Sequence, residues 1–369
     1  MRAVVYRGVN DLRLETVAVP RIGANELLVK VAVCGVCPTD IKKIHYGTVP
    51  PPRIFGHETA GTIVKIGGGN SSLVTRHSSL KIGDRVALHH HVPCLDCHYC
   101  RHHAFAQCET YKRTGITAGF EPAGGGYAEY VRVMPFVLPG VVKIPAKNSF
   151  EEGAMLEPVN TVLKAVKRLE LLRGDTVLVA GQGPIGLMFT KILQLQGVKV
   201  IATDLLASRL KLAKNFGAHR VCLASEVSSL VTRHSSPLDA AIIAVPSDVA
   251  VTQALRLVRG AGKVLLFAHT KRAEVRSQKS EARSPASNLQ PSTFNLDLAS
   301  ICLDEKDIIG SYSSDFMLQR EVARLVFSRR LDVRSLITHR FPLAETPAAI
   351  ALAAHPTEAS LKIMVNVGG

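Results

Sequence analysis

Residues 94–108, CLDCHYCRHHAFAQC, contain four cysteines with two, two and seven residues between them. These cysteines (Cys94, Cys97, Cys100 and Cys108) offer four thiolates to a tetrahedral zinc ion, which then has no position left for a substrate. The spacing therefore predicts a structural zinc site. An iron–sulfur cluster is the alternative, but ferredoxin-type runs space their cysteines differently and place a proline after the last one. The neighbouring histidines are expected to be solvated loop residues and not ligands: His89, His90, His91, His98, His102 and His103.

Residue types that suit a catalytic metal stand upstream, in CGVCPTD (residues 34–40) and GHE (residues 56–58). Cys37, His57 and Glu58 provide one thiolate, one imidazole and one carboxylate, a mixture that fits catalytic zinc. Each motif alone is a weak signal, since a single cysteine is usually a small buried apolar residue. Their occurrence together with the cysteine quartet and a nucleotide-binding pattern favours a catalytic zinc site.

A nucleotide-binding pattern follows in VLVAGQGPIGLM, where Gly181, Gly183 and Gly186 lie between an expected strand and an expected helix. Glycines at these positions let backbone N–H groups and the helix N-terminus approach a pyrophosphate. The next expected strand ends in Asp204, 18 residues after the last glycine. A carboxylate there accepts hydrogen bonds from both ribose hydroxyls of NAD and repels the 2′-phosphate of NADP, so the pattern predicts NAD.

The chain divides into a part with short alternating strands and a part in which strands alternate with helices. These two parts must position the candidate site residues. Short alternating strands with glycine and proline between them predict a β-rich part at residues 27–35, 58–67, 84–88 and 127–133. Buried strands then alternate with helices, as in βαβ units of a parallel sheet. These strands are residues 176–181, 199–204, 239–245 and 262–268, and these helices are residues 184–197, 207–218 and 247–260. The last part has mixed character, with a helix at 316–330 and strands at 336–341 and 362–367.

The chain resembles the zinc-containing medium-chain dehydrogenases over nearly its whole length. The resemblance rests on CGVCPTD, GHETAG, GDRV, the cysteine quartet, GGGYAEY, LEPVNT, GQGPIG and ITHRFPL, which occur in the family's order. It implies an α/β fold in which a GroES-like β-rich catalytic domain, made from both chain ends, accompanies a Rossmann domain with a doubly wound parallel sheet. The expected limits are residues 1–154 and 311–369 for the catalytic domain and residues 155–310 for the NAD-binding domain.

The resemblance also assigns roles at the catalytic zinc. The ligands that it implies are Cys37, His57 and either of two carboxylates, Glu58 and Glu157, bound directly or through water. Thr39 matches the hydroxyl that passes the alcohol proton outward, and Asp40 matches a partner of one of the ligands. Which of the two glutamates binds the metal stays open.

Around the cofactor, the resemblance implies that Ile185 packs behind the nicotinamide ring and that Phe267 and Ser311 face it. Arg209 matches a position beside the adenosine ribose. An arginine there could also meet the 2′-phosphate of NADP, and a solvated helix face is the remaining alternative for Arg209.

The activity that the resemblance implies is the NAD-dependent oxidation of a polyol or a secondary alcohol, with two zinc ions per chain in a homodimer or homotetramer. The chain departs from the polyol branch of the family at two positions. Lys42 stands where many relatives carry a relay histidine, and Ser313 stands where polyol dehydrogenases use an arginine; His45 is expected to lie on the surface. An enzyme like L-threonine 3-dehydrogenase and a non-catalytic protein that binds zinc and a nucleotide are the alternatives.

The bulk composition limits the possible partners. The net charge of +15 comes from basic residues scattered among acidic ones, without an aromatic-rich basic patch, so nucleic acid is not an expected partner. No apolar run approaches the ~18 residues of a membrane span, and the first residues lack the apolar core of a signal peptide. We therefore expect a cytoplasmic protein with reduced thiols and no membrane partner.

Three tracts interrupt the family pattern. SSLVTRHSS occurs at residues 71–79 and again at 228–236, and residues 274–293 are polar and of low complexity. A recognition loop used three times is one interpretation. The favoured interpretation is an exposed, dispensable insertion at each place, because these compositions bury too little apolar surface to offset their ordering entropy.

Overall fold

The computed structural model describes residues 1–68, 80–89, 92–114, 124–227, 229, 238–268 and 296–368. They form two compact units, Met1–Lys164 with Tyr312–Gly369 and Ala165–Ser311. The tracts at 71–79, 228–236 and 274–293 lie outside the described residues, with the exception of Ser229. No helix in the described part of the chain combines the length and the apolar character that crossing a bilayer requires.

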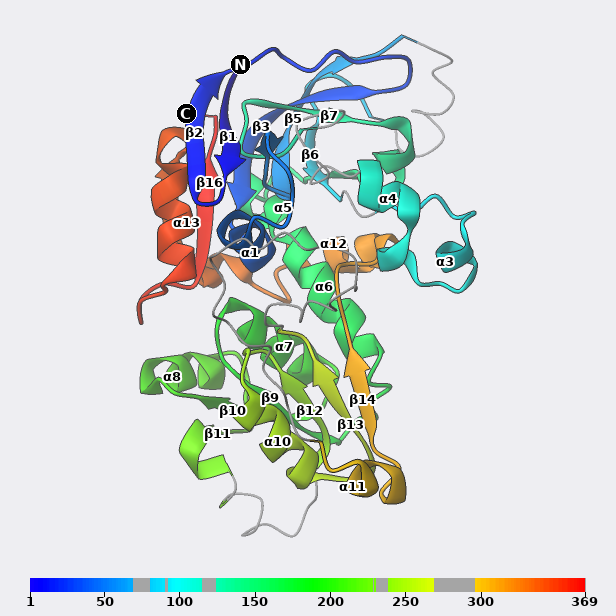
Figure 1. Cartoon of the computed structure of the whole chain (residues 1–369), viewed down its shortest axis with the longest axis vertical. Helices are drawn as coiled ribbons and strands as arrows, with labels where there is room; N and C mark the ends of the chain where they lie inside the picture. The colour runs from blue at the N-terminus through cyan, green and yellow to red at the C-terminus, as the bar shows by residue number, and fades with distance from the viewer. Residues whose placement is uncertain are drawn as a thin grey trace, which may run out of the picture. The chain divides into compact units, whose positions relative to one another are not determined.

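The first unit is rich in strands, and its C-terminal strands complete a sheet begun at the N-terminus. Its strands are β1 (Arg2–Gly8), β2 (Asp11–Thr16), β3 (Leu27–Gly35), β4 (Arg53–Ile54), β5 (Glu58–Ile66), β6 (Arg85–Leu88), β7 (Tyr130–Val133), β8 (Val142–Lys143), β15 (Ile337–Pro342) and β16 (Lys362–Asn366). Within the described residues, a seven-stranded sheet has the order β15-β16-β3-β5-β6-β8 with β7 paired to β3, and a smaller sheet has the order β2-β1-β4. In Figure 1 the red strand β16 lies among the blue N-terminal strands, where it pairs antiparallel with the end of β3.

Apolar side chains explain this arrangement. Strand β3, LLVKVAVCG, is buried along nearly all of its length, and Val29, Val31, Ile63 and Val131 from three neighbouring strands meet in the core of the unit. A strand buried on both faces reads as a near-continuous apolar run, which matches the sequence of β3. The central position of β3 fixes the residues that follow it, including Cys37.

Helices surround the sheets of the first unit. They are α1 (Pro38–Tyr46), α3 (His98–Arg101), α4 (Glu109–Thr114), α5 (Phe150–Ala154), α6 (Leu156–Lys167), α12 (Gln319–Phe327) and α13 (Thr346–Ala354). Helix α1 begins directly after Cys37 with Pro38 in its first turn and ends at Gly47, which has the left-handed φ of 61°. Proline at the start and glycine just past the end are the usual helix limits, so the sequence sets the length of α1 and with it the place of Cys37.

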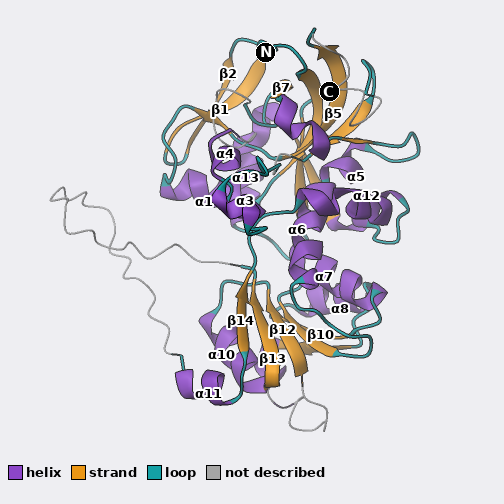
Figure 2. Cartoon of the chain, turned by 90° about the vertical axis from the view of Figure 1, so that its right-hand side faces the viewer, coloured by secondary structure: helices purple, strands orange, loops and turns teal. Residues whose placement is uncertain are grey.

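The second unit is a parallel sheet with helices on both faces. Its strands are β9 (Thr176–Ala180), β10 (Lys199–Asp204), β11 (Arg220–Leu223), β12 (Leu238–Ile243), β13 (Val258–Leu266) and β14 (Asp307–Gly310), and its helices are α7 (Pro184–Leu195), α8 (Ala207–Asn215), α10 (Asp248–Leu257) and α11 (Leu298–Leu303). Within the described residues the strand order is β11-β10-β9-β12-β13-β14, and each neighbouring pair is parallel. Figure 2 shows α7 and α8 on one face of this sheet and α10 on the other. This order is that of a doubly wound dinucleotide-binding fold, and the predicted α/β class is confirmed.

Helix α6 contains the point at which the chain passes from one unit to the other, between Lys164 and Ala165. The change of unit therefore falls within a helix. The domain limits expected from the sequence, 154/155 and 310/311, stay a prediction.

Candidate active site

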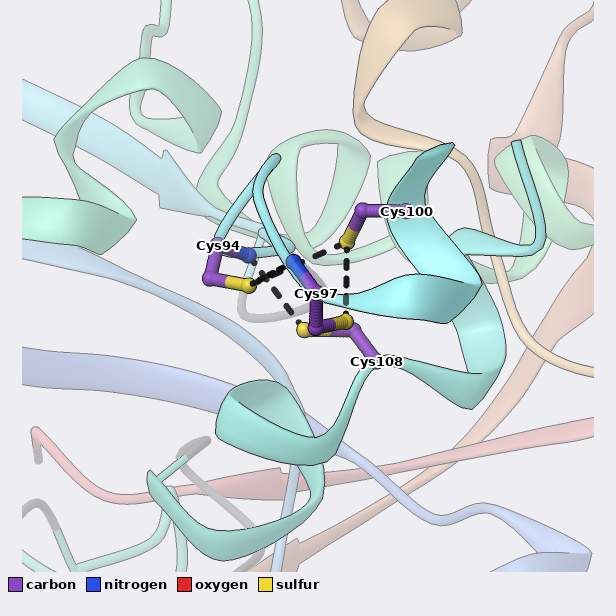
Figure 3. Close-up of side chains that lie close together, drawn as sticks. All are labelled: Cys94, Cys97, Cys100 and Cys108. Carbon is purple, nitrogen blue, oxygen red and sulfur yellow. Dashed lines mark hydrogen bonds between the residues drawn. The ribbon is translucent and has the colours of Figure 1, made fainter. Parts of the chain in front are cut away.

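The four cysteines of residues 94–108 converge on one point. Their sulfur atoms all lie within 4.8 Å of one another, and Figure 3 shows the four side chains turned towards a common centre. Two of the Sγ–Sγ distances are 3.9 Å (Cys94 to Cys100) and 3.5 Å (Cys97 to Cys100). Zinc–sulfur bonds of about 2.3 Å in a tetrahedron place sulfurs roughly 3.8 Å apart, so the quartet fits a four-thiolate zinc site.

Backbone N–H groups favour the thiolate form, which binds a metal, at one cysteine of this quartet. The amides of Asp96 and Cys97 lower the pKa of the Cys94 thiol to about 6. Burial raises the pKa of Cys100 to about 12. A metal that binds all four thiolates must therefore displace the Cys100 proton, so that metal binding is coupled to proton release.

The histidines near the quartet differ in environment. His98, His102 and His103 are exposed, whereas His89 is fully buried. The expectation of a solvated His89 is wrong, because this residue directly follows strand β6 and packs against the turn that contains Gly140. His90 and His91 lie outside the described residues.

A second group of ligands forms where α1 and β5 begin. One ligand atom from each of Cys37, His57 and Glu58 lies within 4.8 Å of the other two. Cys37 precedes α1 and is half-buried, while His57 and Glu58, at the start of β5, are buried. Among the described residues this group has three ligands: one soft sulfur, one imidazole and one carboxylate. Such a donor set suits a catalytic zinc, which keeps a position for substrate.

Asp40 orients the imidazole of His57. The His57 Nδ1 lies 3.2 Å from Asp40 Oδ1, and the Asp40 side chain is fully buried. Burial opposes a charge on His57, but the carboxylate of Asp40 and the neighbouring Cys37 outweigh it and hold the pKa of His57 well above its ordinary value. A carboxylate on Nδ1 leaves Nε2 to bind a metal, which is the role expected for Asp40.

Lys362 is a member of this site that the sequence analysis missed. Its ammonium group forms a buried ion pair with the Glu58 carboxylate, and it donates a hydrogen bond of 2.9 Å to the backbone oxygen of Val36. Gly35 makes room for the pair, since a Cβ there would overlap the Glu58 carboxylate. Lys362 lies 326 residues from Val36, and no local pattern marks it; only the pairing of β16 with β3 brings it to the site.

Glu157 lies close to this group but is not part of it. Its side chain is buried in the first turn of α6. Burial and the charge of Glu58 raise the pKa of Glu157 to about 7 although His57 opposes them. The structure thus brings Glu58 into the ligand group and leaves Glu157 as a nearby carboxyl; the assignment of either glutamate to zinc stays a prediction.

Thr39 and Lys42 lie on α1, three residues apart and therefore on one face of the helix. Both side chains are half-buried. Burial lowers the pKa of Lys42, and Cys37 opposes that change. His45 instead contacts the side chain of Asn10.

The glycine loop of the second unit has the geometry that a pyrophosphate needs. Gly181 has a φ of 92°, and a Cβ on Gly186 would lie 1.8 Å from the Gly181 oxygen, so neither position admits another residue without distortion. The nearest atom to a Cβ on Gly183, at 3.4 Å, would be Nη1 of Arg209. Arg209 is buried, which rules out the solvated helix face and places a cation beside the loop.

Asp204 is held at the end of β10 by two backbone amides. Its Oδ2 accepts a hydrogen bond of 2.6 Å from Gln182 N, and its Oδ1 accepts one of 3.0 Å from Leu206 N. The carboxylate is thereby fixed next to the glycine loop, in the position that a ribose requires. The loop, the N-terminus of α7 and this carboxylate together fit a dinucleotide.

The structure also locates the three residues expected near the nicotinamide. Ile185 is half-buried in the first turn of α7. Phe267 follows β13 and its ring lies 5.0 Å from that of Phe189. Ser311 is buried and donates its backbone N–H to Leu266 O at 3.2 Å. Their contacts with the cofactor stay predictions.

Comparison with known proteins agrees with the two kinds of domain. Residues 23–146 match the model of the alcohol dehydrogenase GroES-like domain, and residues 184–328 match that of the zinc-binding dehydrogenases. A sorbitol dehydrogenase of Bombyx mori is 30% identical over 99% of this chain and 98% of its own length. Among solved structures, an alcohol dehydrogenase from Thermus sp. ATN1 is 27% identical with a TM-score of 0.81 and full coverage of both chains. A putative zinc-binding dehydrogenase of Sinorhizobium meliloti, bound to NADP, is 25% identical with a TM-score of 0.81 over 99% of both chains.

Proposed function

Because the chain belongs to the zinc-containing medium-chain dehydrogenases, we propose that it oxidises a secondary hydroxyl group of a polyol or related alcohol to a carbonyl with NAD. The alcohol and NAD⁺ yield the carbonyl compound, NADH and one proton. The observation that carries this proposal is the cluster of Cys37, His57 and Glu58 in a chain whose second unit has a dinucleotide-binding fold.

Each residue of the metal site has a task in this reaction. Zinc held by Cys37, His57 and a glutamate carboxylate supplies the Lewis acidity that lowers the pKa of the alcohol. Asp40 keeps Nε2 of His57 directed to the metal, and the buried Lys362 holds the Glu58 carboxylate. These contacts fix the ligands before substrate arrives, which is how a site avoids reorganisation during the reaction.

Thr39 is the proposed first acceptor of the alcohol proton. Its hydroxyl can accept one proton while it donates its own to a neighbour, so it passes the proton outward without becoming charged. Lys42 lies one helical turn further along the same face of α1, in the direction in which such a proton would leave the site.

The second unit provides the cofactor site. Bound NAD supplies the hydride acceptor, and the amides at the N-terminus of α7 face its pyrophosphate. Asp204 binds the ribose hydroxyls and repels a 2′-phosphate, which favours NAD over NADP. The buried guanidinium of Arg209, beside Gly183, adds a positive charge next to the glycine loop.

The proposal includes a homodimer or homotetramer in the cytoplasm with no nucleic-acid or membrane partner. Strand β14 is the edge of its sheet in the described residues, and Ile308 on it and Leu303 before it are exposed. An exposed strand edge with apolar neighbours is a template for pairing with a second chain. All eight cysteines of the chain lie in the described part and are free, which suits a reducing compartment.

The decisive experiment measures NADH formation with a panel of polyols, short secondary alcohols and L-threonine, together with zinc content. We expect turnover of at least one alcohol and close to two zinc ions per chain. Cys37→Ser should abolish turnover and leave NAD binding nearly intact, whereas the matched variant at the exposed Cys302, Cys302→Ser, should behave as the parent. An active Cys37→Ser enzyme, or a parent with close to one zinc ion and no turnover, would contradict the proposal.

A further inference from the structure

Gln182 stands between the first two glycines of the loop GQGPIG (residues 181–186), and its side chain is completely buried. A glutamine side chain carries a carbonyl oxygen and an NH₂ group, and burying them without hydrogen bonds is unfavourable. Glutamine is therefore found mostly at protein surfaces. An amide that is kept inside the protein at this place must be matched by specific partners.

Both ends of this side chain are hydrogen-bonded to regular secondary structure. The Nε2 of Gln182 donates to the backbone oxygen of Val179 at 3.1 Å, near the end of β9. Its Oε1 accepts a hydrogen bond of 3.0 Å from the hydroxyl of Thr190, which is fully buried within α7. The side chain thus links the strand before the loop to the helix after it. We call Val179, Gln182 and Thr190 the loop brace.

The third glycine of the loop lies beside the brace. Gly186 and Thr190 are four positions apart and therefore share one face of α7. A Cβ on Gly186 would lie 3.7 Å from Cδ of Gln182, in direct contact with the amide. The glutamine side chain therefore lies against this face of the helix, next to the glycine and bonded to the threonine.

The backbone of Gln182 is fixed as well, because its N–H donates to Asp204 Oδ2 at 2.6 Å. Gly181 before it has a φ of 92°, a conformation that glycine adopts about as readily as its others. A loop with three glycines in six residues has many accessible backbone conformations, and ordering it lowers its entropy. The brace and the Asp204 contact favour one of these conformations before a ligand binds.

We propose that Gln182 and Thr190 are positioning residues for the cofactor, whose hydrogen bond holds the glycine loop in the conformation that binds the pyrophosphate. A loop that is already ordered loses less conformational entropy when a ligand binds, and the affinity is correspondingly higher. The brace acts through the backbone N–H groups of the loop and of the first turn of α7, which face the pyrophosphate. This inference rests on the proposed binding of NAD by the same loop.

The test uses variants that keep the approximate shape of the two side chains and remove their polar atoms. Gln182→Met and Thr190→Val should each raise the Kd for NADH, measured by calorimetric titration of the zinc-loaded protein, by roughly fivefold to tenfold. The KM for NAD should rise with it, whereas kcat at saturating NAD should not fall, because the brace orders the loop and takes no part in hydride transfer. Thr190→Ser keeps the hydroxyl and should bind NADH like the parent. The matched control is Gln196→Met, at an exposed glutamine that ends α7.

The double variant, Gln182→Met with Thr190→Val, separates this role from a merely structural one. Replacing both partners of a buried hydrogen bond by apolar groups of similar shape is nearly neutral for stability. Denaturant unfolding should therefore give the double variant a free energy of unfolding close to that of the parent. Its Kd for NADH should nevertheless stay raised, because the loop is no longer braced. A double variant with parental stability and parental affinity would overturn the inference.

The outcomes also separate this inference from the proposed function. A parent that binds neither NAD nor NADH contradicts the proposed function, and this inference with it. A parent that binds NADH no more tightly than the two single variants do overturns the inference alone. If Gln182→Met does not fold, Thr190→Val decides, since it removes one hydroxyl from the same hydrogen bond.

Discussion

Lys362 and Glu58 form an ion pair that is almost completely buried beside the candidate catalytic metal site. Burial opposes the charge of Lys362, but Glu58 and Cys37 outweigh it and raise its pKa. The pair links β16, which pairs with β3, to Glu58 of the candidate metal site. Removal of either partner would leave the other charge buried without compensation.

Lys362→Met is therefore expected to lower the free energy of unfolding by about 3–5 kcal/mol, because Glu58 would remain buried and unpaired. Denaturant unfolding of the zinc-loaded protein measures the change. Lys81→Met, at an exposed lysine, is the matched control and should change stability by no more than about 0.5 kcal/mol. Equal stability of the two variants would show that the pair contributes nothing to the fold.

Asp40→Asn should weaken zinc binding at the catalytic site by about 10- to 100-fold, because the asparagine amide no longer supports His57 with a negative charge. Competition with a chelator measures the zinc affinity of the catalytic site. Asp96→Asn replaces an exposed carboxylate near the cysteine quartet and should leave that affinity unchanged. An unaltered affinity in Asp40→Asn would remove Asp40 from the site.

Asp204→Ala should shift cofactor preference towards NADP. The carboxylate contacts two amides at the glycine loop, and its loss removes both the ribose acceptor and the repulsion of a 2′-phosphate. We expect the ratio of kcat/KM for NAD to that for NADP to fall by roughly tenfold or more. The exposed Asp248 provides the control, Asp248→Ala; a ratio that stays constant in both variants would refute this role of Asp204.

Cys100→Ser should lower thermal stability and reduce the zinc content from about two ions per chain towards one, since a site with three ligands contributes less to folding. The folded fraction should keep measurable turnover on 2-butanol, and Cys302→Ser should match the parent. Complete loss of activity in well-folded Cys100→Ser with its catalytic zinc present would mean that the quartet is not only structural.

Most of the site residues that the sequence predicts lie close to one another in the chain. Cys94, Cys97 and Cys100 are each separated by two residues, so their spacing alone indicates ligands. His57 and Glu58 are adjacent, but they become candidate ligands only together with Cys37, the cysteine quartet and the nucleotide-binding pattern. The glycine loop and Asp204 belong to one βαβ unit, whose geometry is nearly constant among dinucleotide-binding folds.

The residues that escaped prediction owe their place to tertiary contacts. Lys362 looks like an ordinary lysine at the start of a strand, and only the register of β16 on β3 makes it a partner of Glu58. His89 is buried by the turn at Gly140.

The pairing of β16 with β3 has a consequence for the order in which the protein is made. Lys362 is 326 residues from Val36, so at about 5–20 residues per second a ribosome needs roughly 15–65 s to supply it after β3 has emerged. In the last part of that interval, once Ser311 has been added, Ala165–Ser311 is complete as a chain segment, whereas Glu58 still lacks Lys362 and the end of β3 still lacks β16. The cofactor unit can thus fold on the nascent chain, and the metal centre matures only after β16 has been made.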